Sequence, residues 1–359
     1  MQTVKVDLAD RSYPVYIGSG LLGEKHPAFD VTHGSTVLIV SNETVAPLYL
    51  QTLVSSLAGA DIHSLVLPDG ESYKTQEHWS QIIDKLIEIR ATRDAAVITL
   101  GGGVIGDMGG FAAASYMRGI NFIQVPTSLL AQVDASVGGK TGFNHPMGKN
   151  LIGAFHQPAA VLVDIETLKT LPEREFSAGL AEVVKIAAVR DAEFLGWLEE
   201  NGKAIMARDP DVLTNMIKRS IANKAAVVAE DEREAGVRAL LNFGHSFAHA
   251  LETLTDYRLY LHGEAVAIGM MVAGRLSEIR GLCEAGLTNR LGKILQLFDL
   301  PLELPENLNP EDILETMKLD KKVIAGSARL ILIKSAGQGV IDSSSDKPQI
   351  TAAIQACQT

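Results

Sequence analysis

The 359-residue sequence contains two cysteines, Cys283 and Cys357. They form no CxxC pair, so neither a disulfide framework nor a cysteine metal site is predicted. No run of about 18 residues is apolar without charge or dense glycine, so no membrane span is expected. The opening segment, MQTVKVDLADRSYPVYIG, alternates like a strand and lacks the apolar run of a signal peptide, which predicts a cytoplasmic protein.

The sequence also has fewer basic than acidic residues. Lysine and arginine total 32 against 43 acidic residues, which gives a formal net charge of -11. Nonspecific binding to nucleic acid or to an anionic membrane requires a basic surface, so neither is an expected partner. An acidic protein can still contain a basic pocket, and small anionic ligands therefore remain compatible with this composition.

The length is more than one hydrophobic core usually serves, and the pattern divides near Pro172 into two domains, 1–172 and 173–359. The first half alternates strands with helices, which predicts an α/β domain with a parallel, doubly wound sheet. The second half is predicted to be mainly α-helical. The expected strands are 35–40, 62–67, 95–100, 122–125 and 160–164, with a late strand at 329–334; the expected helices are 78–90, 177–189, 211–229, 246–255, 263–280 and 287–298.

A glycine-rich turn follows the strand AAVITL. Gly101, Gly103 and Gly106 satisfy the pattern G-x-G-x-x-G between a strand and a helix, which favours nucleotide binding over a plain tight turn. In a standard dinucleotide-binding unit this turn follows the first strand and an acidic residue stands about 20 positions later. Here the turn comes later and that acid is missing, so Asn42 or Glu43 is the candidate for the ribose contact.

Three histidines indicate a metal site. His245 and His249 are four apart and would share one helix face, while His262 precedes a glycine and a new helix. Glu182 lies in the apolar helix GLAEVVKIAAV, where burial without a partner would be costly. The spacing leaves open which three residues bind the metal, because His249 is equally suited to acid/base or hydrogen-bonding work.

Other polar groups are less specific. Asp69–Lys74 is predicted to be a solvated turn, and the glycine-rich segment with Asp134, Lys140, Lys149 and Asn150 fits either anion recognition or a plain flexible loop. Arg238 and Asn242 would join His245 and His249 in one stripe if their helix were continuous across Gly244.

Together, several motifs resemble the 3-dehydroquinate synthase family. The motifs are GGGVIGDMGGF, VPTSLLAQVDASVGGKTG, GLAEVVK, DEREAGVRALLNFGHSFAH and LHGEAVAIGM, in that order along the chain. The resemblance implies zinc or cobalt held by Glu182, His245 and His262, and it implies NAD as cofactor. The implied NAD contacts, with Asn42 added from the strand pattern, are Asp69, Gly70, Glu71, Ser72, Tyr73, Lys74, Gly103, Val104, Ile105, Gly106, Asp107, Thr127, Ser128, Lys140, Lys149, Thr167, Leu168, Lys169 and Thr170.

The resemblance also implies the substrate, a phosphorylated seven-carbon sugar acid. It would be oxidised by NAD, lose phosphate, be reduced again, open and close by an aldol step to 3-dehydroquinate, in the shikimate pathway. The implied catalytic residues are Lys140, Lys185, Lys224, Glu234 and His249. The implied substrate contacts are Arg118, Asp134, Lys140, Lys149, Asn150, Lys185, Lys224, Arg238, Asn242, His249, Lys321 and Lys322. Arg118 is similar to an arginine that reaches the neighbouring subunit, which implies a homodimer.

Three other functions compete with this one. A metal-dependent polyol dehydrogenase would not need so many cations, and it would produce net NADH. A cyclase that makes an inosose or a valiolone acts on a substrate without a carboxylate, which Lys224 and Arg238 argue against. A non-catalytic nucleotide-binding module would leave the glutamate and histidines unexplained.

Overall fold

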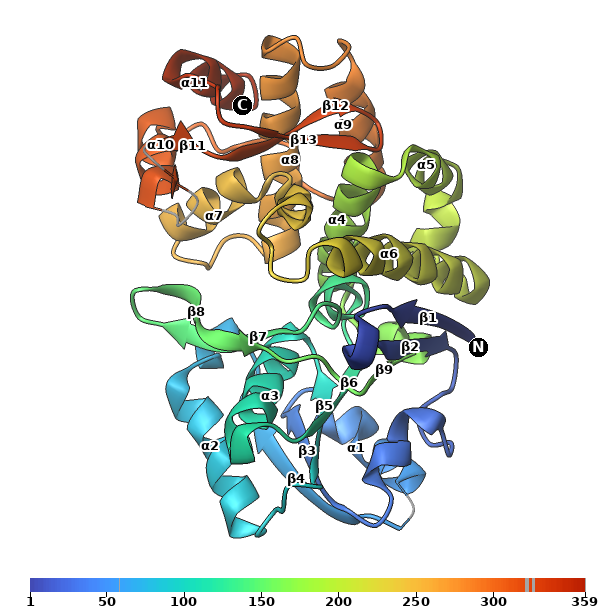
Figure 1. The fold of residues 1–359 in the computed structure, drawn as a ribbon. Helices are drawn as coiled ribbons and strands as arrows, with labels where there is room; N and C mark the ends of the chain where they lie inside the picture. The colour runs from blue at the N-terminus through green and yellow to red at the C-terminus, as the bar shows by residue number, and fades with distance from the viewer. Residues whose placement is uncertain (58, 320–322, 325–326, 359) are drawn as a thin grey trace. The chain divides into compact units, whose positions relative to one another are not determined.

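The computed structural model describes residues 1–57, 59–319, 323–324 and 327–358 (Figure 1). The chain forms two compact units. The first contains Met1–Leu171 and Leu213–Ala229, and the second contains Pro172–Val212 and Glu230–Thr359. The predicted division at residue 172 does not include the return of Leu213–Ala229 to the first unit. Apolar periodicity predicts a helix at this position but does not indicate which core the helix packs against.

The first unit contains a seven-stranded sheet in the order β1-β2-β9-β6-β5-β3-β4. All neighbouring strands are parallel except β1 and β2, which confirms the predicted parallel sheet. The strands are β1 (Gln2–Val6), β2 (Tyr13–Gly18), β3 (Thr36–Asn42), β4 (Asp61–Leu67), β5 (Ala96–Gly101), β6 (Asn121–Pro126) and β9 (Ala160–Asp164).

Helices cover both faces of this sheet. On β3, Val37 and Ile39 belong to one apolar cluster, which contains Leu53 of α1 (Ala46–Ser56). The alternate residues Leu38 and Val40 belong to a second cluster, with side chains from α2 (Gln76–Glu88) and α3 (Gly103–Ser115). Because successive strand residues point to opposite faces, a nearly continuous apolar strand indicates a sheet that is buried on both sides.

The segment after β6 is not a plain flexible loop. A π-helical turn at Ala131–Ala135 leads into an antiparallel hairpin of β7 (Lys140–His145) and β8 (Gly148–Phe155). The hairpin is possible despite its glycines because Gly142 and Gly153 face each other, where a side chain on either would strike the opposite backbone. Glycine here permits close strand pairing rather than mobility.

The second unit is mainly helical, as predicted. Its helices are α4 (Glu173–Arg190), α5 (Ala192–Met206), α7 (His245–Leu254), α8 (His262–Ile279), α9 (Leu287–Leu297), α10 (Pro310–Leu319) and α11 (Lys347–Gln355), and α6 (Pro210–Glu230) connects to the first unit. The late strand is β12 (Leu330–Ser335), which pairs with β13 (Gln338–Asp342); the short strands β10 (Val323–Ile324) and β11 (Ser327–Ala328) also pair. Among the described helices, none has the length and apolarity to cross a membrane.

Helices α4 and α8 pack against each other in the centre of the second unit. Residues Phe176–Val189 of α4 are all buried, and α8 begins against this helix at Gly263. A Cβ at Gly263 would overlap the backbone carbonyl of Ala178, which a side-chain movement cannot relieve. The start of α8 can therefore lie this close to α4 only because residue 263 has no side chain.

Gly263→Ala is expected to lower the free energy of unfolding of the second unit by about 3 kcal/mol or more, because backbone would have to move. Gly196→Ala on α5 is the matched control, since its Cβ would meet only the end of Arg290 at 3.9 Å. That change is expected to be neutral or to stabilise by up to about 1 kcal/mol. Urea unfolding, followed by Trp197 fluorescence in a Trp79→Phe background, checks both values.

Acid is expected to destabilise the first unit through His26. Its Nδ1 accepts a hydrogen bond from the N–H of Ala28 at 3.0 Å, and its ring contacts Tyr16. Burial lowers the pKa of His26, although Asp30 and Glu24 partly oppose this. The unfolded chain therefore takes up the proton first, and stability is lost as the pH falls below about 6.5, the ordinary pKa of histidine.

The His26→Asn variant separates this effect from other titrations. Asparagine is a good helix-capping acceptor that does not titrate, so the variant loses ring packing but should have a flatter pH dependence. The measurement is urea unfolding of both proteins between pH 5 and pH 7.5, followed by Trp79 fluorescence in a Trp197→Phe background. Parallel pH dependences in the two proteins would show that His26 is not responsible.

Candidate functional site

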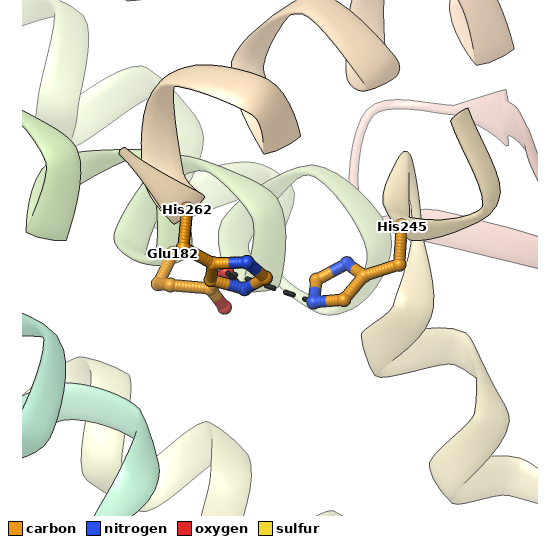
Figure 2. Close-up of side chains that lie close together, drawn as sticks. All are labelled: Glu182, His245 and His262. Carbon is orange, nitrogen blue, oxygen red and sulfur yellow. Dashed lines mark ion pairs between the residues drawn. The ribbon is translucent and has the colours of Figure 1, made fainter. Parts of the chain in front are cut away.

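Three helices bring a carboxylate and two imidazoles together in the second unit (Figure 2). Glu182 comes from the middle of α4, His245 begins α7 and His262 begins α8. Glu182 Oε1 lies 3.8 Å from His245 Nε2 and 3.7 Å from His262 Nε2. Glu182 is almost fully buried, and within the described part of the chain its Oε1 has no hydrogen-bond partner.

This geometry fits a divalent metal ion. Ligand atoms about 2.0–2.2 Å from a tetrahedral ion lie roughly 3.4 Å apart, close to the observed separations. The opposite nitrogens are already engaged: His262 Nδ1 lies 3.2 Å from Glu252 Oε1, and His245 Nδ1 lies 3.4 Å from the Phe243 carbonyl oxygen. Both Nε2 atoms therefore face Glu182, as the ligand set implied by the family resemblance requires.

His249 lies beside the triad but outside it. Its ring centroid is 5.6 Å from that of His245 and 6.3 Å from that of His262. The group of ligand atoms within 4.8 Å of one another contains Glu182, His245 and His262. The alternative that the spacing left open, a metal bound by His249, is not the one that this geometry favours.

The stripe from Arg238 to His249 is not one helix. A short 3-10 helix covers Val237–Asn242, and Gly244 has a left-handed backbone with φ of 81° before α7 begins. The condition for a continuous stripe is therefore not met, and the alternative holds in which Gly244 interrupts the helix, because Gly244 closely approaches the backbone of α8 at Gly269 and Met270. A helical residue with a side chain does not fit there.

The other predicted residues of the second unit make local contacts. Lys185 is buried and donates to Glu182 Oε2, on the side opposite the unpaired oxygen. The Arg238 guanidinium donates to the Glu232 carbonyl, and the Asn242 amide donates to Glu234. Lys321 and Lys322 lie outside the described residues.

In the first unit, predicted cofactor residues gather where parallel strands end at one edge of the sheet, the usual ligand position in this topology. Gly102 caps α3, so Gly103, Val104 and Ile105 lie in its first turn, where backbone N–H groups have no partner within the helix and can meet an anion. A Cβ on Gly106 would lie 2.9 Å from Gln124, so this glycine permits close packing of α3 on β6. Asn42 ends β3 and donates to Asp69 at 2.7 Å.

The segment Asp69–Lys74 is mostly exposed over Asp69–Tyr73, as a solvated turn predicts, but its last residue is not. It contains a 3-10 helix, Glu71–Tyr73, and it ends at Lys74, which is 4% exposed. Lys74 Nζ lies 2.5 Å from Asp107 Oδ2 and 2.7 Å from Asn150 Oδ1. Burial by itself would lower the pKa of Lys74, because it disfavours the charged ammonium. The nearby carboxylates of Asp107 and Glu71 outweigh this effect, so the pKa of Lys74 is raised. The ion pair joins this segment to α3 and to the β7–β8 hairpin.

Two further strand ends carry predicted cofactor residues. Thr127 follows β6 and donates its N–H to the Gly101 carbonyl, with Ser128 next in the chain. Thr167, Leu168, Lys169 and Thr170 lie in the 3-10 helix Ile165–Thr170 after β9. Lys169 is largely exposed and pairs with Glu166 at 2.5 Å, so its ammonium is directed along the surface.

The remaining first-unit residues differ in burial. Lys224 is buried and its Nζ donates to the carbonyl and the carboxylate of Asp134, at 2.5 and 2.7 Å. Lys140 begins β7 and is exposed, whereas Lys149 in β8 is partly buried. Arg118 has a left-handed backbone with φ of 68° after α3. The structure thus gives Lys224 a fixed position and leaves Lys140 open to solvent.

Three buried or bridging residues were missed in the sequence. Glu252 contacts His262, Asn144 accepts from the Asn150 N–H and donates to Glu71, and the Gln132 amide donates to Thr167 and to the carbonyls of Pro126 and Asp164. For Glu252 the signal was an acid on the histidine face of an amphipathic helix. Asn144 and Gln132 carried no such signal, because Glu71 lies 73 residues from Asn144, and Thr167 and Asp164 lie 35 and 32 residues from Gln132.

Fold and triad together define a class: a parallel α/β unit with a glycine-rich turn, joined to a helical unit that carries a Glu/His/His cluster. One solved structure that is similar to this chain, 2-epi-5-epi-valiolone synthase from Streptomyces hygroscopicus subsp. jinggangensis 5008, was obtained with NAD+ and Zn2+ bound. It is 31% identical, covers 98% of each chain and superposes with a TM-score of 0.89.

The chain belongs to the 3-dehydroquinate synthase family. The models of the N-terminal and C-terminal parts of 3-dehydroquinate synthase match residues 64–178 and 179–323. The 3-dehydroquinate synthase of Pseudomonas putida (strain W619) is 52% identical over 99% of this chain and 98% of its own length. That of Nitrosococcus oceani (strain ATCC 19707 / BCRC 17464 / JCM 30415 / NCIMB 11848 / C-107) is also 52% identical, over 99% of both chains.

Proposed function

We propose that this protein is an NAD- and metal-dependent 3-dehydroquinate synthase that acts on 3-deoxy-D-arabino-heptulosonate 7-phosphate. The observation that carries the proposal is the Glu182/His245/His262 cluster, whose Glu182 oxygen is buried and directed at two imidazole nitrogens. It occurs in a chain 52% identical along nearly its whole length to proteins with this activity. Carbon–oxygen bond cleavage with loss of phosphate makes the enzyme a lyase.

The triad would hold zinc or cobalt, and the first turn of α3 with the neighbouring strand ends would hold NAD. Bound metal supplies Lewis acidity toward a substrate hydroxyl, and bound NAD supplies reversible redox capacity. The chain's own residues position the substrate and stabilise its charges. Lys185 keeps one oxygen of Glu182 paired, which directs the other oxygen toward the histidines.

Cationic and polar side chains would bind the two anionic ends of the substrate. For the phosphate we assign Lys140, Lys149, Asn150, His249 and Arg118, with Lys321 or Lys322 as a further cation. For the carboxylate we assign Lys224 and Arg238. The contacts of Lys224 with Asp134 support this role, because a buried ammonium on a fixed partner needs no reorganisation when it meets an anion.

Proton transfers would use groups near these ends. We assign Lys140, Lys185, Lys224, Glu234 and His249 to catalysis, with Asn242 oriented by its hydrogen bond to Glu234. The leaving phosphate can serve as the base for its own elimination. We further propose a homodimer, with Arg118 completing the neighbouring subunit's site, and a cytoplasmic location.

Product analysis with two substrates tests this function. Protein, NAD and zinc are incubated with the heptulosonate phosphate, or with a hexose phosphate that lacks a carboxylate, and phosphate and NADH are followed. The proposal predicts phosphate release from the sugar acid and no net NADH. Net NADH with a simple polyol and no phosphate release would instead establish a polyol dehydrogenase, and preference for the hexose phosphate would establish a different cyclase.

A further inference from the structure

A buried carboxylate lies behind one of the metal-site histidines. Glu252, on α7, is 3% exposed, and its Oε1 lies 3.2 Å from Nδ1 of His262. The other ring nitrogen of His262, Nε2, lies 3.7 Å from Glu182 Oε1. The imidazole is therefore held between two carboxylates from different helices, one at each nitrogen.

The position of Glu252 follows from the helical repeat of α7. His245, His249 and Glu252 are at positions i, i+4 and i+7, which place all three on one face of the helix. The neighbouring Ala250 and Leu251 are buried and apolar. A carboxylate in such surroundings is costly unless it has a polar partner, and the His262 ring supplies one.

We propose that Glu252 is a positioning residue for the metal centre, and this inference rests on the proposed metal-dependent function. Glu252 accepts a hydrogen bond from Nδ1–H of His262, which fixes the tautomer whose Nε2 carries the lone pair. The negative charge of the acceptor makes that lone pair a stronger donor to a metal ion. Nδ1 of His245 lies 3.4 Å from the Phe243 carbonyl oxygen, which is a neutral acceptor, whereas Glu252 offers His262 a charged one.

The backbone of His262 is held by different contacts. Glu264 accepts from the N–H of Leu261 at 2.8 Å, which caps the start of α8. Arg174 of α4 donates to both oxygens of Glu264, each at 2.7 Å. Because these contacts do not involve Glu252, its removal is expected to free the His262 ring without displacing the start of the helix.

The test compares metal affinity in Glu252→Leu, Glu252→Gln and the unaltered protein. Co2+ is titrated into metal-free protein and followed by its visible absorption, and Zn2+ affinity is measured by competition with a chelator. Glu252→Leu is expected to bind either ion 10–100-fold more weakly. Glu252→Gln keeps an oxygen acceptor but loses the charge, so its affinity should fall between the other two.

Two controls make the result specific. Glu199→Gln removes the charge from a carboxylate that pairs with Arg290 elsewhere in the second unit, and it should leave metal affinity unchanged. Thermal unfolding in excess chelator shows whether each variant folds without metal. If Glu252→Leu does not fold, Glu252→Gln alone decides: weaker binding than the unaltered protein supports the inference.

Equal affinities for the unaltered protein and the folded Glu252 variants would overturn the positioning role while leaving the metal site intact. The failure of the proposed function looks different. In that case the unaltered protein itself would bind neither Co2+ nor Zn2+ at this site, and the inference about Glu252 would fall with it.

Discussion

Replacing His262 by glutamine is expected to abolish tight binding of zinc or cobalt and to lower kcat/KM by roughly a thousandfold or more. One of three ligands is lost, and the several kcal/mol that a Lewis acid contributes to the transition state correspond to a factor of this size. The geometric basis is the approach of His262 Nε2 to Glu182 Oε1, at 3.7 Å. Metal content after dialysis and steady-state kinetics provide the two measurements.

His249→Gln is the informative comparison for this variant. His249 is close to both ligand histidines but outside the triad, so the variant should keep its metal and lose activity through weaker substrate binding or proton transfer. A protein that loses metal on His249→Gln and retains it on His262→Gln would reverse the ligand assignment. The pair of variants thus separates the two alternatives that the sequence spacing alone left open.

Replacing Lys74 by methionine is expected to lower the free energy of unfolding of the first unit by about 3–5 kcal/mol, because it leaves the Asp107 carboxylate without its partner. Lys74 is 4% exposed and lies 2.5 Å from Asp107. The effect is read from urea unfolding followed by Trp79 fluorescence in a Trp197→Phe background, since Trp79 stacks on Phe111 of α3 in this unit.

The pH dependence gives this second prediction its sign. Burial raises the pKa of Asp107, and the ammonium of Lys74 partly offsets this rise in the unaltered protein. Without Lys74, protonation relieves the unpaired charge in the folded state, so the loss of stability should shrink as the pH falls. Lys74→Met combined with Asp107→Asn should recover most of the loss, and strictly additive effects of the two substitutions would contradict a direct pair.

The sheet and most helices could be predicted because the order of apolar and polar residues within each segment indicates which side chains are buried. β3 and β5 are almost continuous apolar runs, and α9 (Leu287–Leu297) has apolar residues on one face. The β7–β8 hairpin was missed because its strands contain glycine, lysine and asparagine, which are poor strand formers. The return of Leu213–Ala229 to the first unit was missed because it depends on tertiary packing, which periodicity does not encode.

Part of the site could also be predicted from the residues alone. A glutamate inside an apolar helix and two histidines four apart indicate a metal site, and the structure brings Glu182 to His245 and His262. The choice of His262 over His249 required the family resemblance, because it depends on how α7 and α8 cross. The burial of Lys74 could not be predicted, since its partners lie 33 and 76 residues away along the chain.

One assay tests the central claim most directly. The protein, freed of metal by a chelator, is incubated with NAD and 3-deoxy-D-arabino-heptulosonate 7-phosphate, and phosphate release is followed before and after Zn2+ is added. We predict no release without metal, and release that starts on adding Zn2+ with no accumulation of NADH. Phosphate release that is indifferent to the chelator, or no release with Zn2+ present, would contradict the account.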